Sequence, residues 1–129
     1  DHPFGPLLLG CPAALKVPGL RLSSAAAVPG SQVRAAIAAG ERVGLASGSV
    51  ATGLEVKVDI APLGPVDHLV QVDAAVAPGS SGAPVVDEDM NVLGFIVAGS
   101  TDPDRPVSYV YPVARWARHV TAVPSDGAP

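Results

Sequence analysis

The segment Ala77-Pro78-Gly79-Ser80-Ser81-Gly82-Ala83-Pro84-Val85-Val86 decides the expected fold of this chain. It places Ser81 among small residues, in a tight loop that leads directly into an apolar strand. Glycine tolerates backbone dihedrals that other residues avoid, so such a loop can aim one hydroxyl and several backbone N–H groups at a single point. Acyl transfer needs that arrangement. Pro78-Gly79-Ser80-Ser81-Gly82 is also ordinary composition for a β-turn, so these five residues alone favour a plain turn.

The composition of the 129 residues favours one domain built from short strands. Gly and Pro number 14 each and are spread between apolar segments, which indicates many strands joined by turns. The net charge of −4 comes without a basic stripe and with few aromatic residues, so nucleic-acid binding is not expected. No apolar run approaches the ~20 residues of a membrane span. We expect no cofactor and no metal.

Two features bear on the source of the chain. The single Cys11 excludes an internal disulfide and therefore does not fix the compartment. The chain opens with Asp1 rather than Met, so we expect a mature, trimmed or excised piece.

The hydrophobic pattern predicts antiparallel β structure with one terminal helix. Residues 54–60 alternate apolar and charged side chains strictly, which is the period of a half-buried strand. Further strands are expected at 32–38, 42–51, 68–74, 83–86, 92–98 and 107–111. The Ala-rich stretch 35–39 could alternatively form a short helix. Pro112 is expected to open a helix that runs to about Val120, and the whole pattern is typical of a barrel or a sandwich.

The residues around the serine change the interpretation of the loop. The segment 72–86, Val-Asp-Ala-Ala-Val-Ala-Pro-Gly-Ser-Ser-Gly-Ala-Pro-Val-Val, resembles the nucleophile segment of chymotrypsin-fold serine peptidases. It is closest to the bacterial HtrA (Deg) and related trypsin-like branch. Residues 91–100 resemble the strand beside the bound substrate in that family, and 107–116 resemble its last strand and C-terminal helix. The resemblance, which covers roughly 13–120, implies an all-β fold: an antiparallel six-stranded Greek-key barrel of the chymotrypsin type, the second barrel of the pair, with a short C-terminal helix.

The resemblance also implies how the chain is organised. Residues 1–12 are expected to be an N-terminal segment that is a remnant of the first barrel or a cover for its face. Residues 13–121 are expected to form the barrel with its helix, and 122–129 a flexible tail. A lone second barrel exposes an apolar face that seeks a partner, so we expect Pro3–Leu9, or a second chain or segment completing the first barrel, to cover it. The resemblance favours an extracytoplasmic or secreted bacterial protein.

Carried over by position, Ser81 is the candidate nucleophile. The N–H groups of Gly79 and Ser81, with Ser80 between them, would form the oxyanion hole. The backbone of Val97, Ala98 and Gly99 would pair with an extended peptide or protein substrate. The pocket for the side chain at the cleavage position would be walled by Ala75, Val76, Ala98 and Val107. These walls are small or apolar, so we expect a small apolar side chain there.

The resemblance does not identify a catalytic base in this chain, or the acidic residue that would orient that base. A serine hydroxyl is a poor nucleophile without a base, and in this family the His and Asp come from the first barrel. Cys11 stands where the resemblance would place an aspartate. The remaining candidates are better interpreted as ordinary surface or terminal residues: His2, His68, His119, Asp1 and Asp73.

Three functions therefore stay open. The first is a serine endopeptidase domain whose His and Asp lie on a missing or separate N-terminal half. The second is a catalytically inactive, peptidase-like module that binds an extended peptide or a protein partner. The third is a structural β domain in which the serine loop is only a turn.

Overall fold

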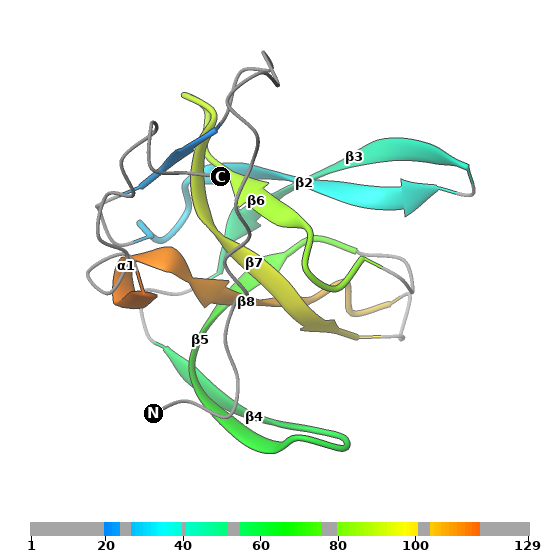
Figure 1. Ribbon diagram of the computed structural model, residues 1–129, viewed down its shortest axis with the longest axis vertical. Helices are drawn as coiled ribbons and strands as arrows, with labels where there is room; N and C mark the ends of the chain where they lie inside the picture. Colours follow the sequence, from blue (N-terminus) through cyan, green and yellow to red (C-terminus); the bar gives the residue numbers. More distant parts are fainter. Residues whose placement is uncertain are drawn as a thin grey trace, which may run out of the picture.

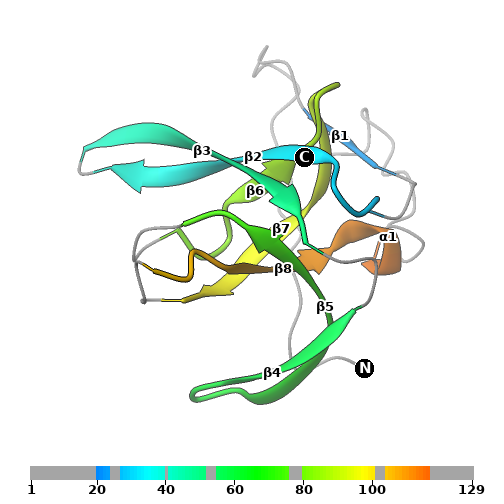
Figure 2. The same cartoon turned by 180° about the vertical axis from the view of Figure 1, so that it is seen from behind.

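The computed structural model describes residues 20–23, 27–39, 41–51, 55–75, 80–100 and 104–116. Within them lie eight strands and one helical turn (Figures 1 and 2). Their bounds are β1 Arg21–Leu22, β2 Gln32–Ala39, β3 Arg42–Val50, β4 Val56–Ile60, β5 Gly64–Asp73, β6 Pro84–Val86, β7 Asn91–Gly99, β8 Ser108–Pro112 and α1 Val113–Trp116. No helix in these described segments is long and apolar enough to cross a membrane.

Six of the strands close into a ring. β2 pairs with β3, β3 with β5, β5 with β8, β8 with β7, β7 with β6, and β6 with β2, all antiparallel. Closure pairs each strand of the ring on both sides, although the outer parts of β2 and β3 extend beyond the ring. β5 is followed along the chain by β6, which lies on the far side of β2, so the order around the ring is that of a Greek key. The predicted six-stranded antiparallel barrel is confirmed, and its β5–β6 crossover carries the serine loop.

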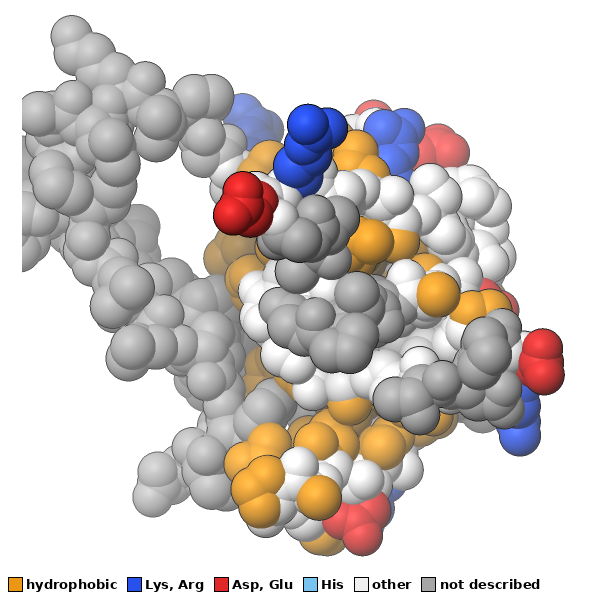
Figure 3. Space-filling view, turned by 90° about the vertical axis from the view of Figure 1, so that its right-hand side faces the viewer, with side chains coloured by type: hydrophobic (Ala, Val, Ile, Leu, Met, Phe, Trp, Pro, Cys, Tyr) orange, Lys and Arg blue, Asp and Glu red, His pale blue; other side chains and the backbone are white. Residues whose placement is uncertain are grey.

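Two elements lie outside the ring. β4 pairs with the first part of β5 and forms a hairpin below the barrel, where apolar side chains gather in Figure 3. The two residues of β1 run parallel to the start of β7, with Arg21 opposite Asn91. β5 begins at Gly64, earlier than the predicted 68–74, because pairing with β4 extends the strand.

Three other sequence-based expectations can be compared with the structure. The strand predicted over 54–60 is present as β4, and the Ala-rich stretch 35–39 belongs to β2 and not to a helix. Pro112 ends β8, where it stands opposite Gly94, and the helix therefore starts one residue later than predicted. The structure describes α1 only to Trp116, so the rest of the predicted helix lies outside the described residues.

The core is filled mainly by valine and alanine, because the chain has few aromatic residues. Every strand of the ring contributes to the main cluster, which consists of Val33, Ala35, Val50, Val72, Ala74, Val85, Ile96 and Val110. Close approach of the strands needs glycine at two positions. A Cβ on Gly48 would overlap the carbonyl of Asp73, and one on Gly94 would overlap the carbonyl of Tyr111.

Candidate active site

The serine lies at the second position of a tight turn. The N–H of Ala83 donates to the carbonyl of Ser80 at 3.0 Å, which closes the turn over Ser81 and Gly82. Gly82 has φ +88°, the positive φ that the third position of a type II turn requires. Ser81 is exposed on this turn, whereas Ser80 is 3% exposed and belongs to the interior. The chain therefore presents one serine side chain to solvent and buries its neighbour.

Backbone hydrogen bonds attach this turn to β7. The N–H of Gly82 donates to the carbonyl of Ile96 at 2.7 Å, and the N–H of Ile96 donates to the carbonyl of Ala83 at 2.9 Å. The N–H and the carbonyl of Ile96 therefore both bond to the serine turn. They lie on the same edge of β7 that pairs with β6 earlier in the strand. Since Ile96 is itself 2% exposed in the core, the turn is attached to a buried part of β7.

The same edge of β7 continues toward Gly99. The N–H of Ser100 donates to the carbonyl of Val107 at 2.8 Å, so it points toward the chain that leads into β8. In a trans peptide the preceding carbonyl points the opposite way, so the carbonyl of Gly99 faces the open edge, on the side of the serine turn. Gly99 is exposed, and it lies about 10 Å along the strand from Ile96 at ~3.3 Å per residue.

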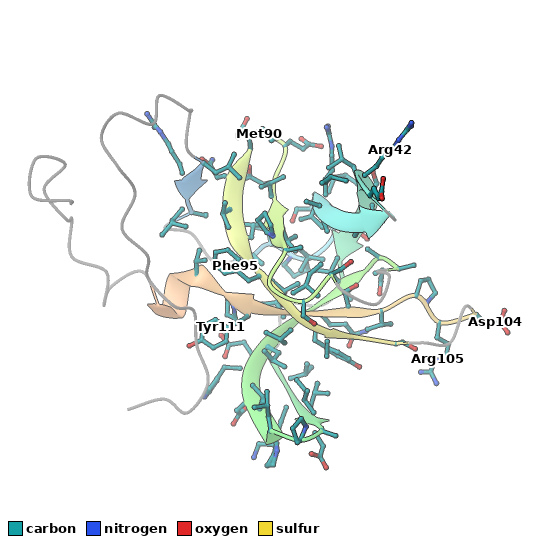
Figure 4. All side chains as sticks on the ribbon, turned by 45° about the vertical axis from the view of Figure 1, so that its right-hand side comes forward. Arg42, Met90, Phe95, Asp104, Arg105 and Tyr111 are labelled. Carbon is teal, nitrogen blue, oxygen red and sulfur yellow. The ribbon has the colours of Figure 1, made fainter. Side chains whose placement is uncertain are left out.

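The other predicted edge and pocket residues are placed as follows. The β7–β8 register shifts between Ile96 and Ala98, so Val97 and Ala98 form a bulge, and both are half-buried. Val107 is half-buried just before β8, and Ala75 is exposed just after β5. Asp104 and Arg105, in the β7–β8 connection, lie out from the end of the barrel (Figure 4). The predicted residues Val76 and Gly79 lie outside the described part of the chain, so the oxyanion hole stays a prediction.

Ser108 is a residue that the sequence analysis missed. Its side chain is 1% exposed, and its hydroxyl donates to the carbonyl of Ala74. Ser108 is also the register partner of Gly99. It thus ties β8 to the end of β5, immediately before Ala75. The only signal in the sequence was a serine within a largely apolar strand.

His68 is engaged elsewhere. It lies in a bulge of the β4–β5 hairpin with φ +64°, and its Nδ1 is 2.7 Å from Oε2 of Glu55. The path through paired strands from the serine turn runs from Ile96 to Val110 and then to Val70. Together with the step from the turn to Ile96, this path has three strand spacings, about 14 Å around the ring at ~4.8 Å each, and His68 lies two residues before Val70, in the part of β5 that pairs with β4. The imidazole of His68 is held by Glu55 beside β4, and no hydrogen bond joins it to Ser81 in the described part of the chain.

Among the other candidate acid–base groups, only Asp73 lies in the described part of the chain, and no hydrogen bond or ion pair joins it to Ser81 there. Asp73 is exposed at the end of β5, opposite Ser49. The remaining candidates lie outside the described residues: Asp1, His2, Cys11 and His119. Across the described ranges, no group of three His, Cys, Asp or Glu side chains could hold a metal ion.

Comparison with known proteins agrees with this geometry. Residues 7–95, more than half of the chain, match the family model described as "Trypsin-like peptidase domain". No curated protein matches the sequence. The matches do not single out the HtrA (Deg) branch.

The solved structures that the chain resembles include several proteases. The active form of the Rv3671c protease from M. tuberculosis superposes with a TM-score of 0.68 at 20% identity, over 87% of this chain and 53% of that one. Cellulomonas bogoriensis chymotrypsin gives 0.60 at 24% identity, over 74% and 49%. Thermobifida fusca Protease A gives 0.63 at 20% identity, over 84% and 55%. The chain spans about half the length of the solved structures that it matches, and at these identities the likeness is one of fold.

Proposed function

This chain belongs to the trypsin-like peptidase domain family, and from that premise we propose that it forms the C-terminal barrel of a serine endopeptidase with Ser81 as nucleophile. One observation carries the proposal: an exposed serine on a turn that is hydrogen-bonded to the edge of β7. The same edge offers the carbonyl of Gly99 to an extended chain. A peptide paired along that edge would present a carbonyl carbon to Ser81.

The reaction we propose is acyl transfer in two steps. The Oγ of Ser81 bonds to the carbonyl carbon while a base accepts its proton. The N–H groups of Gly79 and Ser81 would stabilise the oxyanion, with Ser80 between them. The amine then leaves with the proton, and water releases the acyl group by the same route.

The base and its orienter come, in this proposal, from a missing or separate N-terminal half. A second chain or segment that completes the first barrel would bring the His and Asp to Ser81. The engagement of His68 with Glu55, far around the barrel, supports a base from outside the described residues. Loss of the serine or histidine of a triad lowers turnover by roughly 10⁶-fold, so completion of the site would decide whether the protein is active.

The substrate class follows from the pocket residues. Ala75, Ala98 and Val107 are small or apolar, and the hydroxyl of Ser108 beside them is occupied by a backbone carbonyl. We therefore propose a peptide or protein substrate with a small apolar side chain at the cleavage position, with Val76 as a further wall and Val97 as part of the pairing edge.

The proposal includes the organisation of the chain. Residues 13–121 form the barrel unit with its helix, and 122–129 a tail. Residues 1–12 belong to the first-barrel side, where Pro3–Leu9 can cover the exposed face in cis.

A second candidate function is an inactive, peptidase-like binding module. The observation that favours it is that neither His68 nor Asp73, the candidates among the described residues, reaches Ser81. Such a module would keep the Gly99 edge and bind an extended peptide or a protein partner without cleaving it.

Labelling with a fluorophosphonate probe separates these functions. The native assembly, purified with whatever chain accompanies it, is treated beside Ser81→Ala and a control variant, Ser47→Ala, at an exposed serine on β3. Labelling that is lost only in Ser81→Ala supports the endopeptidase. Absence of labelling, together with peptide binding that weakens when Gly99 is changed to Pro, supports the binding module. Absence of both leaves only the structural β domain.

A further inference from the structure

Part of the β2–β3 hairpin stands clear of the barrel. The two strands pair without interruption from Gln32 opposite Ser49 to Ala39 opposite Arg42. β6 reaches β2 only at Arg34 and Ala35, and β5 reaches β3 only at Ser49 and Val50. Residues 36–39 and 42–48 therefore form a projecting arm, which Figures 1 and 2 show plainly and at whose end Figure 4 labels Arg42.

The outward face of the arm is apolar. Ile37 packs against the main core cluster, so its side of the hairpin faces the barrel. Val43 and Leu45 lie on the opposite face, where they are 77% and 68% exposed. They are the two most exposed of the large hydrophobic side chains in the described parts of the chain.

The backbone of β3 also has an open edge. Val50 exchanges hydrogen bonds with the β2 side, because its N–H donates to Ser31 and its carbonyl accepts from Gly30. Residues alternate in direction along a strand, so the N–H and C=O groups of Val43, Leu45 and Ser47 point away from β2. β5 leaves this edge after Asp73, where the N–H of Ala74 turns back to the carbonyl of Val72. Within the described segments, no strand pairs with positions 43–47 on that side.

This edge lacks the usual protection against strand addition. Exposed edges in monomeric proteins commonly carry charged residues, proline or a bulge. No charged residue and no proline occurs from position 43 to 50, and the β2–β3 register has no shift. An apolar, regular and uncharged edge of this kind is suited to pairing with another strand.

We propose that this edge pairs with the same edge of a second copy of the chain, antiparallel about a two-fold axis through Leu45. In that register Leu45 stands opposite Leu45 of the second copy, and Val43 stands opposite Ser47 of the second copy. In this register each residue whose N–H and C=O groups point away from β2 stands opposite another such residue. Two facing residues of this kind exchange two hydrogen bonds, so the three pairs form about six. The two-fold register is closed, so the contact joins two copies and no more.

The charges permit this register. Arg42 stands opposite Gly48 of the second copy, so no like charges meet across the axis. A two-fold axis through Val43 instead would keep only one of the three pairings, because Leu45 would meet Glu41 in the turn and Ser47 would meet Ala39, the last residue of the other copy's β2. One pair of short strands buries an area at the low end for protein interfaces, so the dimer is weak and forms with rising concentration.

Cysteine cross-linking tests the register in the full chain with Cys11→Ser. Facing residues of such a pair have Cα atoms about 5.5 Å apart, within the range of a disulfide. Leu45→Cys should therefore cross-link with itself under mild oxidation. Val43→Cys and Ser47→Cys should cross-link with each other when mixed and not separately, and Val28→Cys, an exposed position away from the arm, should not cross-link. Self-linking of Val43→Cys, or no link through Leu45→Cys, overturns the proposal.

Sedimentation velocity tests the interface without cysteines. The unmodified chain should shift from monomer to dimer as its concentration rises toward about 1 mM, the range of weak association. Leu45→Lys places two like charges across the axis and should raise the dissociation constant at least about tenfold. Val28→Lys is the matched control and should leave it unchanged, and both variants are first checked for an unaltered circular dichroism spectrum. A monomer throughout, or a dimer that Leu45→Lys does not weaken, refutes the second copy as the occupant of this edge.

Discussion

The hydroxyl of Ser108 offers a direct test of how the site is supported. Ser108→Ala removes the donor to the carbonyl of Ala74 and little volume, so the main consequence is a buried carbonyl without that partner. A buried polar group left unsatisfied costs about 1–3 kcal/mol. We therefore expect Ser108→Ala to lower the free energy of unfolding by about 2 kcal/mol, a large part of the ~5–15 kcal/mol that holds a domain together.

Urea unfolding measures this effect, and a second serine supplies the control. Ser31 also donates its hydroxyl to a backbone carbonyl, that of Val28, but in an exposed turn where water can replace it. With a slope of about 1–3 kcal/mol per M of urea, Ser108→Ala should lower the midpoint by about 1 M, and Ser31→Ala by a third of that or less. Equal midpoints for the two variants, or a midpoint of Ser108→Ala equal to that of the unsubstituted chain, would refute the reasoning that burial makes this bond strong.

Three further substitutions test the backbone that shapes the barrel and its turns. Gly94→Ala should destabilise the chain by about 3 kcal/mol or more in urea unfolding, since the new methyl group meets the Tyr111 carbonyl within the β7–β8 pair and cannot move away. Gly82→Ala should cost less, about 1–2 kcal/mol by the same assay, because the space around it is open and only the positive φ is unfavourable. Met90→Gly should raise the thermal midpoint by stabilising the chain by about 0.5–1 kcal/mol, since Met90 holds φ +64° in the turn before β7; a lower midpoint would contradict this.

Local pattern and resemblance predicted different parts of the fold. The strict alternation of apolar and charged residues over 54–60 was sufficient to predict β4, because successive side chains of a strand point to opposite faces. Closure of the six strands came from the resemblance around the serine loop, since no local pattern specifies that β6 crosses over to pair with β2. The start of β5 was predicted too late, because a proline-containing stretch became a strand once β4 lay beside it.

The contacts that support the candidate site could not be predicted because they join distant residues. Ser108 and Ala74 are 34 positions apart, and only the register of β5, β8 and β7 brings them together. The engagement of His68 likewise depends on a bulge that places it opposite β4, near Glu55. A sequence reports which residues can donate or accept a hydrogen bond, whereas the fold selects the partner.

The way the serine turn is held bears on how its chemistry can be tested. The hydrogen bonds that close the turn and attach it to β7 join backbone groups of Ser80, Gly82, Ala83 and Ile96. Among the described residues, the hydroxyl of Ser81 makes no hydrogen bond, and its side chain is exposed. Removal of that hydroxyl therefore leaves the turn and its attachment to β7 in place. It follows that a change in Ser81→Ala reports the chemistry or binding of the hydroxyl and not the stability of the loop, while an unchanged variant would favour a purely structural turn.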